Sequence, residues 1–215
     1  MGTQSELQQT ITDMVDDTRG ILAIDESLPT MAKRFAPIGV ESTESHREAY
    51  RSLLLATPGL GDYISGVILF EETLTQHDGK GQALPRVAWS QKIVPGIKVD
   101  KGKGPMALSP GDLITQGLDG LADRLRQYKE QGARFAKWRE VYAIEGSVNG
   151  QVPTRHGIEA NAEMLARYAA ICQATGIVPI VEPEVLMMAI TISSAMQRSP
   201  RPCSTLCFMR YIGIM

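Results

Sequence analysis

Apolar residues fall in short, nearly continuous runs along this chain, and three runs carry two charged residues spaced two apart. Near-continuous apolar runs are typical of strands buried on both faces, as in a parallel sheet. Because side chains alternate between the faces of a strand, both charges of a pair would point to the same side. The pairs are Lys98 with Asp100, Lys137 with Arg139, and Glu182 with Glu184.

Charges at spacing two would also fit the solvated face of a sheet, and for any single run this alternative is equally good. The apolar setting argues against it. Ile93, Val94 and Ile97 precede the first pair and Val99 lies between its members, while Ile177 and Val178 precede the last pair. Three such runs in succession favour a polar site built into a core.

Amphipathic segments alternate with these runs, so the chain reads as strand then helix, repeated five times. This order predicts an α/β fold with a parallel sheet and right-handed crossovers. Thr43 can cap one helix, and Gly117 and Gly120 suggest an irregular opening turn in another. We expect strands near residues 20–25, 66–72, 93–101, 134–142 and 176–183, and helices near 4–17, 30–36, 43–56, 112–131 and 157–175.

Composition narrows the class of protein. The chain has 215 residues, 43% hydrophobic and 21% charged, with a net charge of −2, which fits one globular domain with a sizeable core. Basic residues interleave with acidic ones, so no nucleic-acid partner is expected. The polar N-terminus lacks the apolar stretch of a signal peptide, and no run approaches transmembrane length. We therefore expect a cytoplasmic protein without a membrane partner.

The cysteines and histidines show no metal-ligand spacing such as CxxC or HxxxH, so we expect neither a metal site nor a cofactor. This removes a metal-dependent route to polarising a carbonyl group. Cys172 lies in an apolar helical pattern and reads as a buried thiol. The other residues of these types are Cys203, Cys207, His46, His77 and His156.

Polar residues at the carboxyl ends of parallel strands commonly form active sites in α/β barrels. Asp25 follows the first predicted strand, and the three charged pairs, apart from Asp100, fall at later strand ends. The candidate site residues on this basis are Asp25, Lys98, Lys137, Arg139, Glu182 and Glu184.

Several segments together resemble the class I fructose-bisphosphate aldolases, which are metal-independent and form a Schiff base. The resemblance spans about residues 5–187 and implies a (β/α)8 barrel, of which about five units are present here. It also implies reversible cleavage of fructose 1,6-bisphosphate to dihydroxyacetone phosphate and glyceraldehyde 3-phosphate. The segments are GILAIDES, SGVILFEETL, VPGIKVDKG, TQGLDGLADRLRQYKEQGARFAKWR and NAEMLARYAAICQATGIVPIVEPEVL.

Aldol cleavage needs an amine to form an iminium at the ketone, a base for the hydroxyl proton and an acid to expel water. The resemblance implies that Asp25 helps to handle the hydroxyl proton. Glu182 matches the glutamate that transfers protons at the Schiff base, with Glu184 beside it. Lys137 matches a second lysine near the nucleophile, whose ammonium group would lower the nucleophile's pKa.

A bisphosphate needs cations or backbone donors at both ends. Thr30 replaces a serine common in the family, and LPT replaces the more usual TGS. Structural alternatives remain open: Asp25 as a helix cap, Arg34 and Arg47 as surface charges, and Glu184 as a partner of Lys137. The substrate-binding residues that the resemblance implies are Ser27, Thr30, Lys33, Arg34, Arg47, Lys98 and Arg139.

The Schiff-base lysine of the family lies in a LLKPNMV-like motif of strand six, and no such motif occurs in these 215 residues. We expect residues 1–187 to form a partial barrel domain and residues 188–215 to be a disordered tail foreign to the family. Loss of one G after the ATG codon of a family-like VLMDGDH sequence would encode MMAITISSAMQRSP, so we hypothesise a one-base deletion. Resequencing of the source DNA that finds the codons uninterrupted would refute a sequencing error.

Two classes of function stand at this point. The first is a class I aldolase that takes a phosphosugar substrate and, as the family does, assembles into a homo-oligomer. The second is a catalytically inactive truncated fragment, because five βα units cannot close an eight-stranded barrel and would leave strand edges unpaired.

Overall fold

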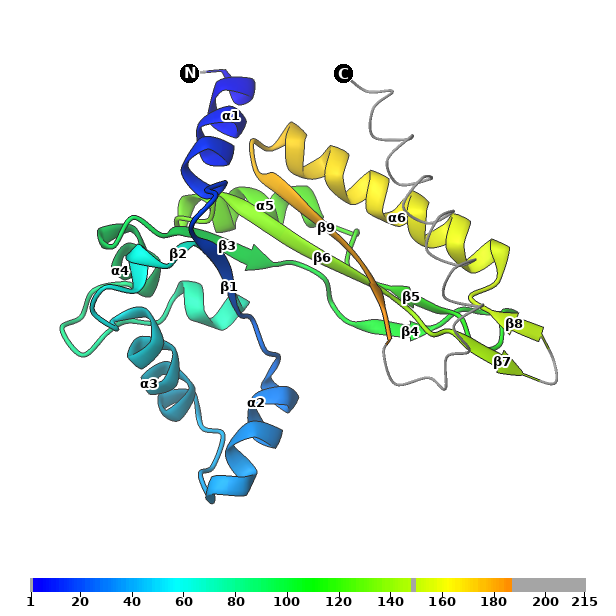
Figure 1. Cartoon of the computed structure of the whole chain (residues 1–215), viewed down its shortest axis with the longest axis horizontal. Helices are drawn as coiled ribbons and strands as arrows, with labels where there is room; N and C mark the ends of the chain where they lie inside the picture. Colours follow the sequence, from blue (N-terminus) through cyan, green and yellow to red (C-terminus); the bar gives the residue numbers. More distant parts are fainter. Residues whose placement is uncertain (1, 148–149, 187–215) are drawn as a thin grey trace. The chain divides into compact units, whose positions relative to one another are not determined.

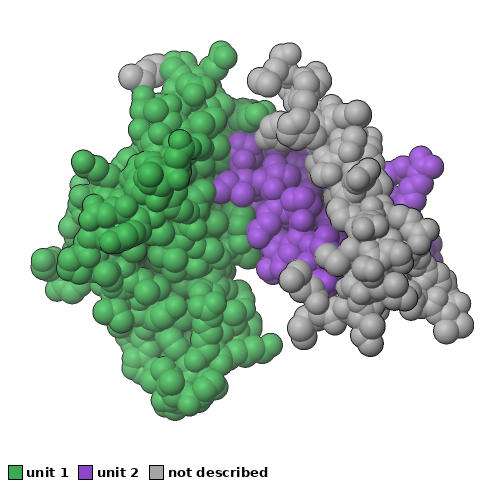
Figure 2. All heavy atoms as spheres, viewed as in Figure 1, with its two compact units in different colours: residues 1–98, 122–137, 172–178 green, residues 99–121, 138–171, 179–215 purple. Residues whose placement is uncertain are grey.

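The computed structural model describes residues 2–147 and 150–186. The chain divides into two compact units, which Figure 2 shows in different colours. Unit 1 comprises residues 1–98, 122–137 and 172–178, and unit 2 comprises residues 99–121, 138–171 and 179–215.

A parallel sheet forms the framework of unit 1. Strands β1 (Gly20–Ile24), β2 (Ile64–Leu69) and β3 (Val94–Lys98) pair in parallel, and β3 pairs in parallel with the start of β6 (Phe135–Tyr142). The full strand order is β1-β2-β3-β6-β9, where β9 is Val178–Val185 (Figure 1). The predicted parallel α/β arrangement with five main strands is confirmed.

Helices connect the strands of unit 1. Three were predicted closely: α1 (Thr3–Met14), α2 (Leu28–Phe35) and α3 (Glu44–Leu55). Helix α4 (Leu84–Ser90) was not predicted, and α5 (Leu121–Glu130) is shorter than expected. Three short 3-10 helices lie between these elements, at Ala36–Ile38, Leu60–Asp62 and Glu71–Leu74.

The prediction that Thr43 caps a helix is confirmed, whereas the glycine-containing turn lies before α5 rather than inside a helix. Thr43 caps α3, because its side-chain oxygen accepts a hydrogen bond of 3.2 Å from the backbone N–H of His46. Ahead of α5, Gly117 and Gly120 have φ angles of +121° and +65°. Residues with a side chain rarely adopt these angles, so the chain turns irregularly here before the helix begins.

The core of unit 1 depends on one close backbone approach. The aromatic ring of Phe135 lies directly over Gly96, and a Cβ atom on Gly96 would come within 2.3 Å of the ring. Gly96 and Phe135 are register partners on neighbouring strands, and Phe135 is fully buried. A glycine is therefore required at position 96, because any side chain there would collide with the Phe135 ring when β3 pairs with β6.

Unit 2 contains two antiparallel hairpins that sequence reasoning missed. One pairs β4 (Lys103–Pro105) with β5 (Leu113–Thr115), and the other pairs β7 (Glu145–Ser147) with β8 (Gly150–Val152). All four strands have three residues, too short for an alternating pattern to be visible in the sequence.

Helix α6 (Arg155–Ala174) packs in unit 2 on the end of β6 and on β9. The ring centroids of Trp138 and Tyr168 lie 5.5 Å apart, and the Tyr168 hydroxyl donates to the carbonyl of Ile180. In unit 1, the last turn of α6 buries the thiol of Cys172 completely, as predicted. No helix in the described part of the chain is long and apolar enough to cross a membrane.

Three predicted boundaries were wrong. Strand β2 ends at Leu69, because the next residues turn into the 3-10 helix Glu71–Leu74. The helix predicted from residue 112 begins only at Leu121, because β5 and the glycine turn precede it. Strand β3 ends at Lys98, so Asp100 does not share a strand face with it. The predicted tail, residues 188–215, lies outside the described residues.

Candidate active site

An ion pair joins the first and fourth strands of the sheet in unit 1. The Nζ atom of Lys137, on β6, lies 2.7 Å from the Oδ2 atom of Asp25, the residue that follows β1. The two side chains are only 11% and 13% exposed. Helix α2 takes Ser27 as its N-cap, so Asp25 is not the helix cap that one alternative proposed.

This contact requires a curved sheet, because β2 and β3 lie between the two strands in the pairing order. Three inter-strand spacings amount to about 14 Å in a flat sheet, and side chains stand roughly perpendicular to it. Asp25 and Lys137 can meet at 2.7 Å only if this face is concave. The sheet of unit 1 therefore directs its polar side chains towards one another.

Lys98 lies on the same part of the sheet. It is the last residue of β3 and is the register partner of Lys137 on β6. Side chains at paired positions of neighbouring strands point to the same face. Lys98 therefore adds a second cation to the face that carries the Asp25–Lys137 pair, and its side chain is partly exposed.

In unit 2, a second ion pair connects β6 with β9. The Nη1 atom of Arg139 lies 2.9 Å from the Oε2 atom of Glu184, with 42% and 36% of the side chains exposed. Glu182 lies two residues earlier on β9, so it shares the face of Glu184. The structure thus gives Glu184 an ion pair with Arg139 and gives Lys137 an ion pair with Asp25.

Helix α2 carries most of the predicted phosphate-side residues. The Oγ atom of Ser27 lies 3.0 Å from the Oγ1 atom of Thr30, so the two hydroxyls share a hydrogen bond. Lys33 is exposed. The guanidinium of Arg34, with 55% of its side chain exposed, forms an ion pair with Glu26. Arg34 is therefore an exposed residue as the surface alternative held, but it has a defined buried partner.

Arg47 is held differently. Its Nε atom donates to Glu72 Oε2 at 2.8 Å, its Nη2 atom donates to Glu72 Oε1 at 2.5 Å, and Nη1 donates to Ser42. Its side chain is only 11% exposed, which contradicts the surface-charge alternative. The hydrogen bonds that Arg47 donates to Glu72 raise the pKa of Arg47 above its ordinary value. All three nitrogen atoms of the Arg47 guanidinium group therefore donate to partners within the protein, Glu72 and Ser42.

Two residues that sequence reasoning did not select belong to the same region. Glu26 immediately follows Asp25, and Arg51 lies one helical turn after Arg47 on α3. Arg51 is 2% exposed and pairs with Glu26. The burial of Arg51 could not be predicted from the sequence, because a charged residue on an amphipathic helix is expected to face solvent.

Glu140 is a further unexpected buried carboxyl, with no exposed surface, on the face of β6 opposite Lys137 and Arg139. It accepts hydrogen bonds from Trp138 Nε1 at 2.8 Å and from the backbone N–H of Thr115 at 3.1 Å. Burial raises the pKa of Glu140, and the negative charge of Asp100 adds to the effect. Glu140 thereby ties the β4–β5 hairpin to β6.

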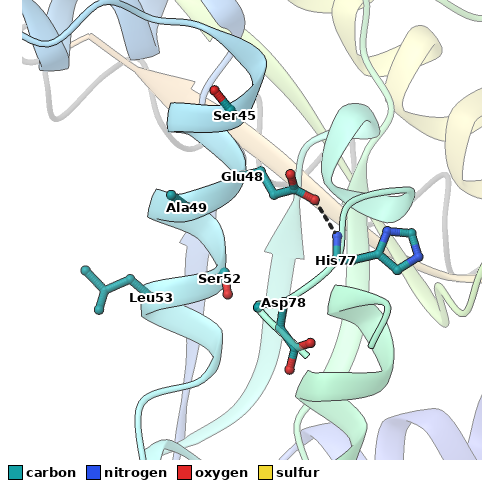
Figure 3. Close-up of a pocket in the computed structure, with 8 residues that line it drawn as sticks. Ser45, Glu48, Ala49, Ser52, Leu53, His77 and Asp78 are labelled. Carbon is teal, nitrogen blue, oxygen red and sulfur yellow. Dashed lines mark hydrogen bonds between the residues drawn. The ribbon is translucent and has the colours of Figure 1, made fainter. Parts of the chain in front are cut away.

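A surface pocket of about 460 Å³ lies elsewhere in unit 1, between α3 and the loop that contains His77 (Figure 3). Two of its lining residues are joined, because Glu48 accepts a hydrogen bond of 2.8 Å from the backbone N–H of His77. None of the predicted site residues lines it. Within residues 2–147 and 150–186, no cluster of histidine, cysteine and acidic side chains could hold a metal ion.

Comparison with known proteins identifies the family. A family model of class-I fructose-bisphosphate aldolase matches residues 6–194. A probable fructose-bisphosphate aldolase class 1 from Xanthomonas campestris is 53% identical over 182 residues, covering 85% of this chain and 53% of the relative. A chloroplastic fructose-bisphosphate aldolase from rice is 54% identical over 182 residues, covering 85% of this chain and 46% of the relative.

A solved structure shows the same fold. The fructose-bisphosphate aldolase of Plasmodium falciparum, crystallised with TRAP and a small-molecule inhibitor, superimposes with a TM-score of 0.92 at 43% identity. The match covers 97% of this chain and 59% of that one. This chain spans about half the length of the curated relatives it matches, and its α/β fold is part of a barrel. The chain belongs to the class I fructose-bisphosphate aldolase family.

Proposed function

We propose that the protein catalyses reversible aldol cleavage of fructose 1,6-bisphosphate to dihydroxyacetone phosphate and glyceraldehyde 3-phosphate through a Schiff base. The observation that carries this proposal is the ion pair between Lys137 and Asp25. A cation and a carboxylate, each almost nine-tenths buried on a concave face, provide a fixed field and a proton acceptor beside the bound ketose.

Asp25 is the group we assign to the hydroxyl proton that leaves during cleavage. Its carboxylate is oriented by the ion pair of 2.7 Å with Lys137. Lys137 in turn is a fixed positive charge beside the amine that forms the Schiff base. A neighbouring ammonium favours the neutral form of that amine, which is the nucleophilic form.

Glu182 and Glu184 supply the second proton-transfer group in this proposal. Dehydration of the carbinolamine needs an acid, and a glutamate on β9 can provide it. Arg139 holds Glu184 at 2.9 Å. We assign the proton transfer at the Schiff base to Glu182, as the family resemblance implies. Lys98 and Arg139 add positive charge for the phosphorylated substrate. Ser27, Thr30, Lys33, Arg34 and Arg47 form the remaining set that we assign to the sugar and its C6 phosphate, with Arg47 acting from its ion pair with Glu72.

A joined chain tests the aldolase proposal directly. Residues 1–187 would be fused to the C-terminal remainder of the Xanthomonas relative, which is 53% identical to this chain over the shared region. Cleavage of fructose 1,6-bisphosphate would be followed by coupled oxidation of NADH. We expect turnover with this substrate. A folded fusion that forms no triose phosphate would overturn the proposal.

For the 215-residue polypeptide by itself, the second candidate is catalytic inactivity. The observation that favours it is the absence of a LLKPNMV-like lysine motif from the sequence. We expect borohydride treatment of this polypeptide with dihydroxyacetone phosphate to leave its mass unchanged. A covalent adduct in the mass spectrum would show that another lysine forms the Schiff base.

Three further proposals come from the sequence and its family resemblance. We propose that the protein assembles into a homo-oligomer, acts in the cytoplasm and has a domain boundary near residue 187. Analytical ultracentrifugation tests the oligomer, and a monomer would contradict it. Cell fractionation tests the location, and a membrane-bound pool would contradict it. Limited proteolysis tests the boundary, and cleavage confined to residues before 187 would contradict it.

A further inference from the structure

A compact ionic network lies beside the candidate site in unit 1, and it joins the end of β1 to α2 and α3. Glu26 is at its centre and is 8% exposed. One carboxylate oxygen, Oε2, pairs with Arg51 of α3, and the other, Oε1, pairs with Arg34 of α2. Arg51 also donates from Nη2 to the backbone carbonyl of Glu26 at 3.1 Å.

The two arginines differ greatly in exposure, and this asymmetry indicates what each one does. Arg51 is 2% exposed, whereas Arg34 is 55% exposed. A buried carboxylate needs a buried counter-ion, and Arg51 already supplies one. Glu26 therefore does not need Arg34 for its own neutralisation. Two guanidinium groups and one carboxylate leave one net positive charge, which lies at the exposed end.

Tyr50 closes the network from α3. Its hydroxyl accepts a hydrogen bond of 3.4 Å from Arg34 Nη1, while the guanidinium carbon of Arg51 lies 5.6 Å from the centre of its ring. The ring also packs edge-on against Phe35, with centroids 5.8 Å apart. Tyr50 is thus fixed by its ring and holds Arg34 by its hydroxyl.

Hydroxyl groups accompany Arg34 along α2. Ser27, Thr30 and Arg34 are spaced three and four residues apart, which places them on one side of the helix and its first turn. The Ser27 and Thr30 hydroxyls lie within 3.0 Å of each other. A phosphate monoester accepts hydrogen bonds from hydroxyls and binds strongly to a guanidinium fork.

We propose that Glu26, Arg51 and Tyr50 are positioning residues that hold the Arg34 guanidinium ready for the substrate phosphate. This inference rests on the proposed aldolase function. A free arginine side chain loses much conformational freedom when it binds an anion, and a preset fork avoids part of that loss. Glu26 and Tyr50 both bind the Nη1 atom of Arg34 and so fix this edge of the fork, while Arg51 cancels the charge of Glu26 so that it does not compete with phosphate.

The test uses the chain as it exists, with fructose 6-phosphate as the probe. Isothermal titration calorimetry would compare the unmodified chain with Arg34→Met, Tyr50→Phe and Glu26→Gln. Arg126→Met on α5 is the matched control, because Arg126 is an exposed arginine paired with Asp123 in the same chain. We expect at least about tenfold weaker binding for Arg34→Met, the scale of a hydrogen bond to a charged group, and about fivefold for Tyr50→Phe, the scale of a typical hydrogen bond.

Glu26→Gln removes the carboxylate beside the buried Arg51, so it could unfold the chain and give no information. Tyr50→Phe avoids this, because it removes only a hydroxyl and keeps the ring contacts with Arg51 and Phe35. In the fused enzyme, Tyr50→Phe should raise KM for fructose 1,6-bisphosphate and leave kcat unchanged. A purely structural role of the network would not produce that split.

The possible results separate this inference from the proposed function. If the unmodified chain and Arg34→Met bind fructose 6-phosphate equally, Arg34 does not bind the phosphate. The positioning role is then overturned, and the proposed function loses Arg34 as a phosphate-binding residue. If Arg34→Met weakens binding but Tyr50→Phe binds as the unmodified chain does, the positioning role is overturned while the site stands. Weakened binding by Tyr50→Phe, with Arg126→Met unaffected, supports the network.

Discussion

Lys137 and Asp25 form an ion pair of 2.7 Å although two strands of the sheet lie between them. The pair thus reports on the curvature of the sheet as well as on the chemistry of its concave face. Both side chains are almost nine-tenths buried, so solvent screens their attraction only in part.

Removing one partner of this pair should destabilise the protein. We expect Lys137→Met to lower the free energy of unfolding by about 3 kcal/mol, because Asp25 would keep a largely buried charge without its ion-pair partner. Urea denaturation measures this. The double variant Asp25→Asn with Lys137→Met should be less destabilised than the sum of the single variants. Strict additivity would show that the two side chains do not interact.

The contact between Gly96 and Phe135 gives a second prediction. Gly96→Ala should lower the free energy of unfolding by about 3 kcal/mol, because its Cβ would lie 2.3 Å from the ring. Gly104→Ala in β4 is the matched control, since its nearest neighbour would be the Gln116 side chain at 3.7 Å. Equal thermal stability of the two variants would argue against the close approach.

The hydroxyl of Tyr128 on α5 should lose its proton at a higher pH than an ordinary tyrosine. Burial and a hydrogen bond of 2.6 Å to Glu71 raise the pKa of Tyr128 to about 12. Between the ordinary tyrosine pKa near 10 and this value, the unfolded state releases a proton that the folded state keeps, so stability should fall as pH rises. Tyr128→Phe should remove this component of the fall. Phenolate absorbance near 295 nm in the native chain would follow the ionisation, and a fully normal titration of every tyrosine would contradict it.

Glu140 should make stability depend on pH in the acidic to neutral range. Burial raises the pKa of Glu140 above its ordinary value of 4.5, so the folded state holds a proton that the unfolded state has released. The contribution of Glu140 to stability is then largest below pH 4.5 and declines as pH rises through the raised folded value.

Glu140→Gln removes this titration. Its stability relative to the unmodified chain should therefore improve as pH rises from about 4, measured by urea denaturation at several pH values. Asp100→Asn should weaken the pH dependence in the unmodified background, because the charge of Asp100 raises the pKa of Glu140. Parallel stability curves for Glu140→Gln and the unmodified chain would contradict the assignment.

The long strands of this fold could be predicted from the sequence, and the hairpins could not. The run around Ile93 and Ile97 is buried over nearly every residue, so its apolar pattern was strong. Strands β4 and β5 have three residues each and depend on contacts with β6, such as the hydrogen bond of 2.7 Å from Thr115 Oγ1 to the Arg139 carbonyl. Such short strands are set by tertiary contacts.

The candidate site shows the same limit. Strand spacing correctly placed Lys137 with Arg139 on β6 and Glu182 with Glu184 on β9. It could not show that Lys137 would reach Asp25, because that distance depends on sheet curvature. Nor could it show that Arg51 is buried, because a charged residue on an amphipathic helix is expected to face solvent.

The most direct test of the central claim is the rate of fructose 1,6-bisphosphate cleavage by the fused enzyme with Lys137→Met. Lys129→Met is the control, because Lys129 makes a comparable ion pair of 2.6 Å with Glu6 but belongs to no proposed site. We predict that Lys137→Met lowers kcat at least about 100-fold, the scale of acid–base catalysis, while Lys129→Met leaves it within a factor of about 2. Equal kcat values for the two variants would show that the Lys137–Asp25 pair has no catalytic role.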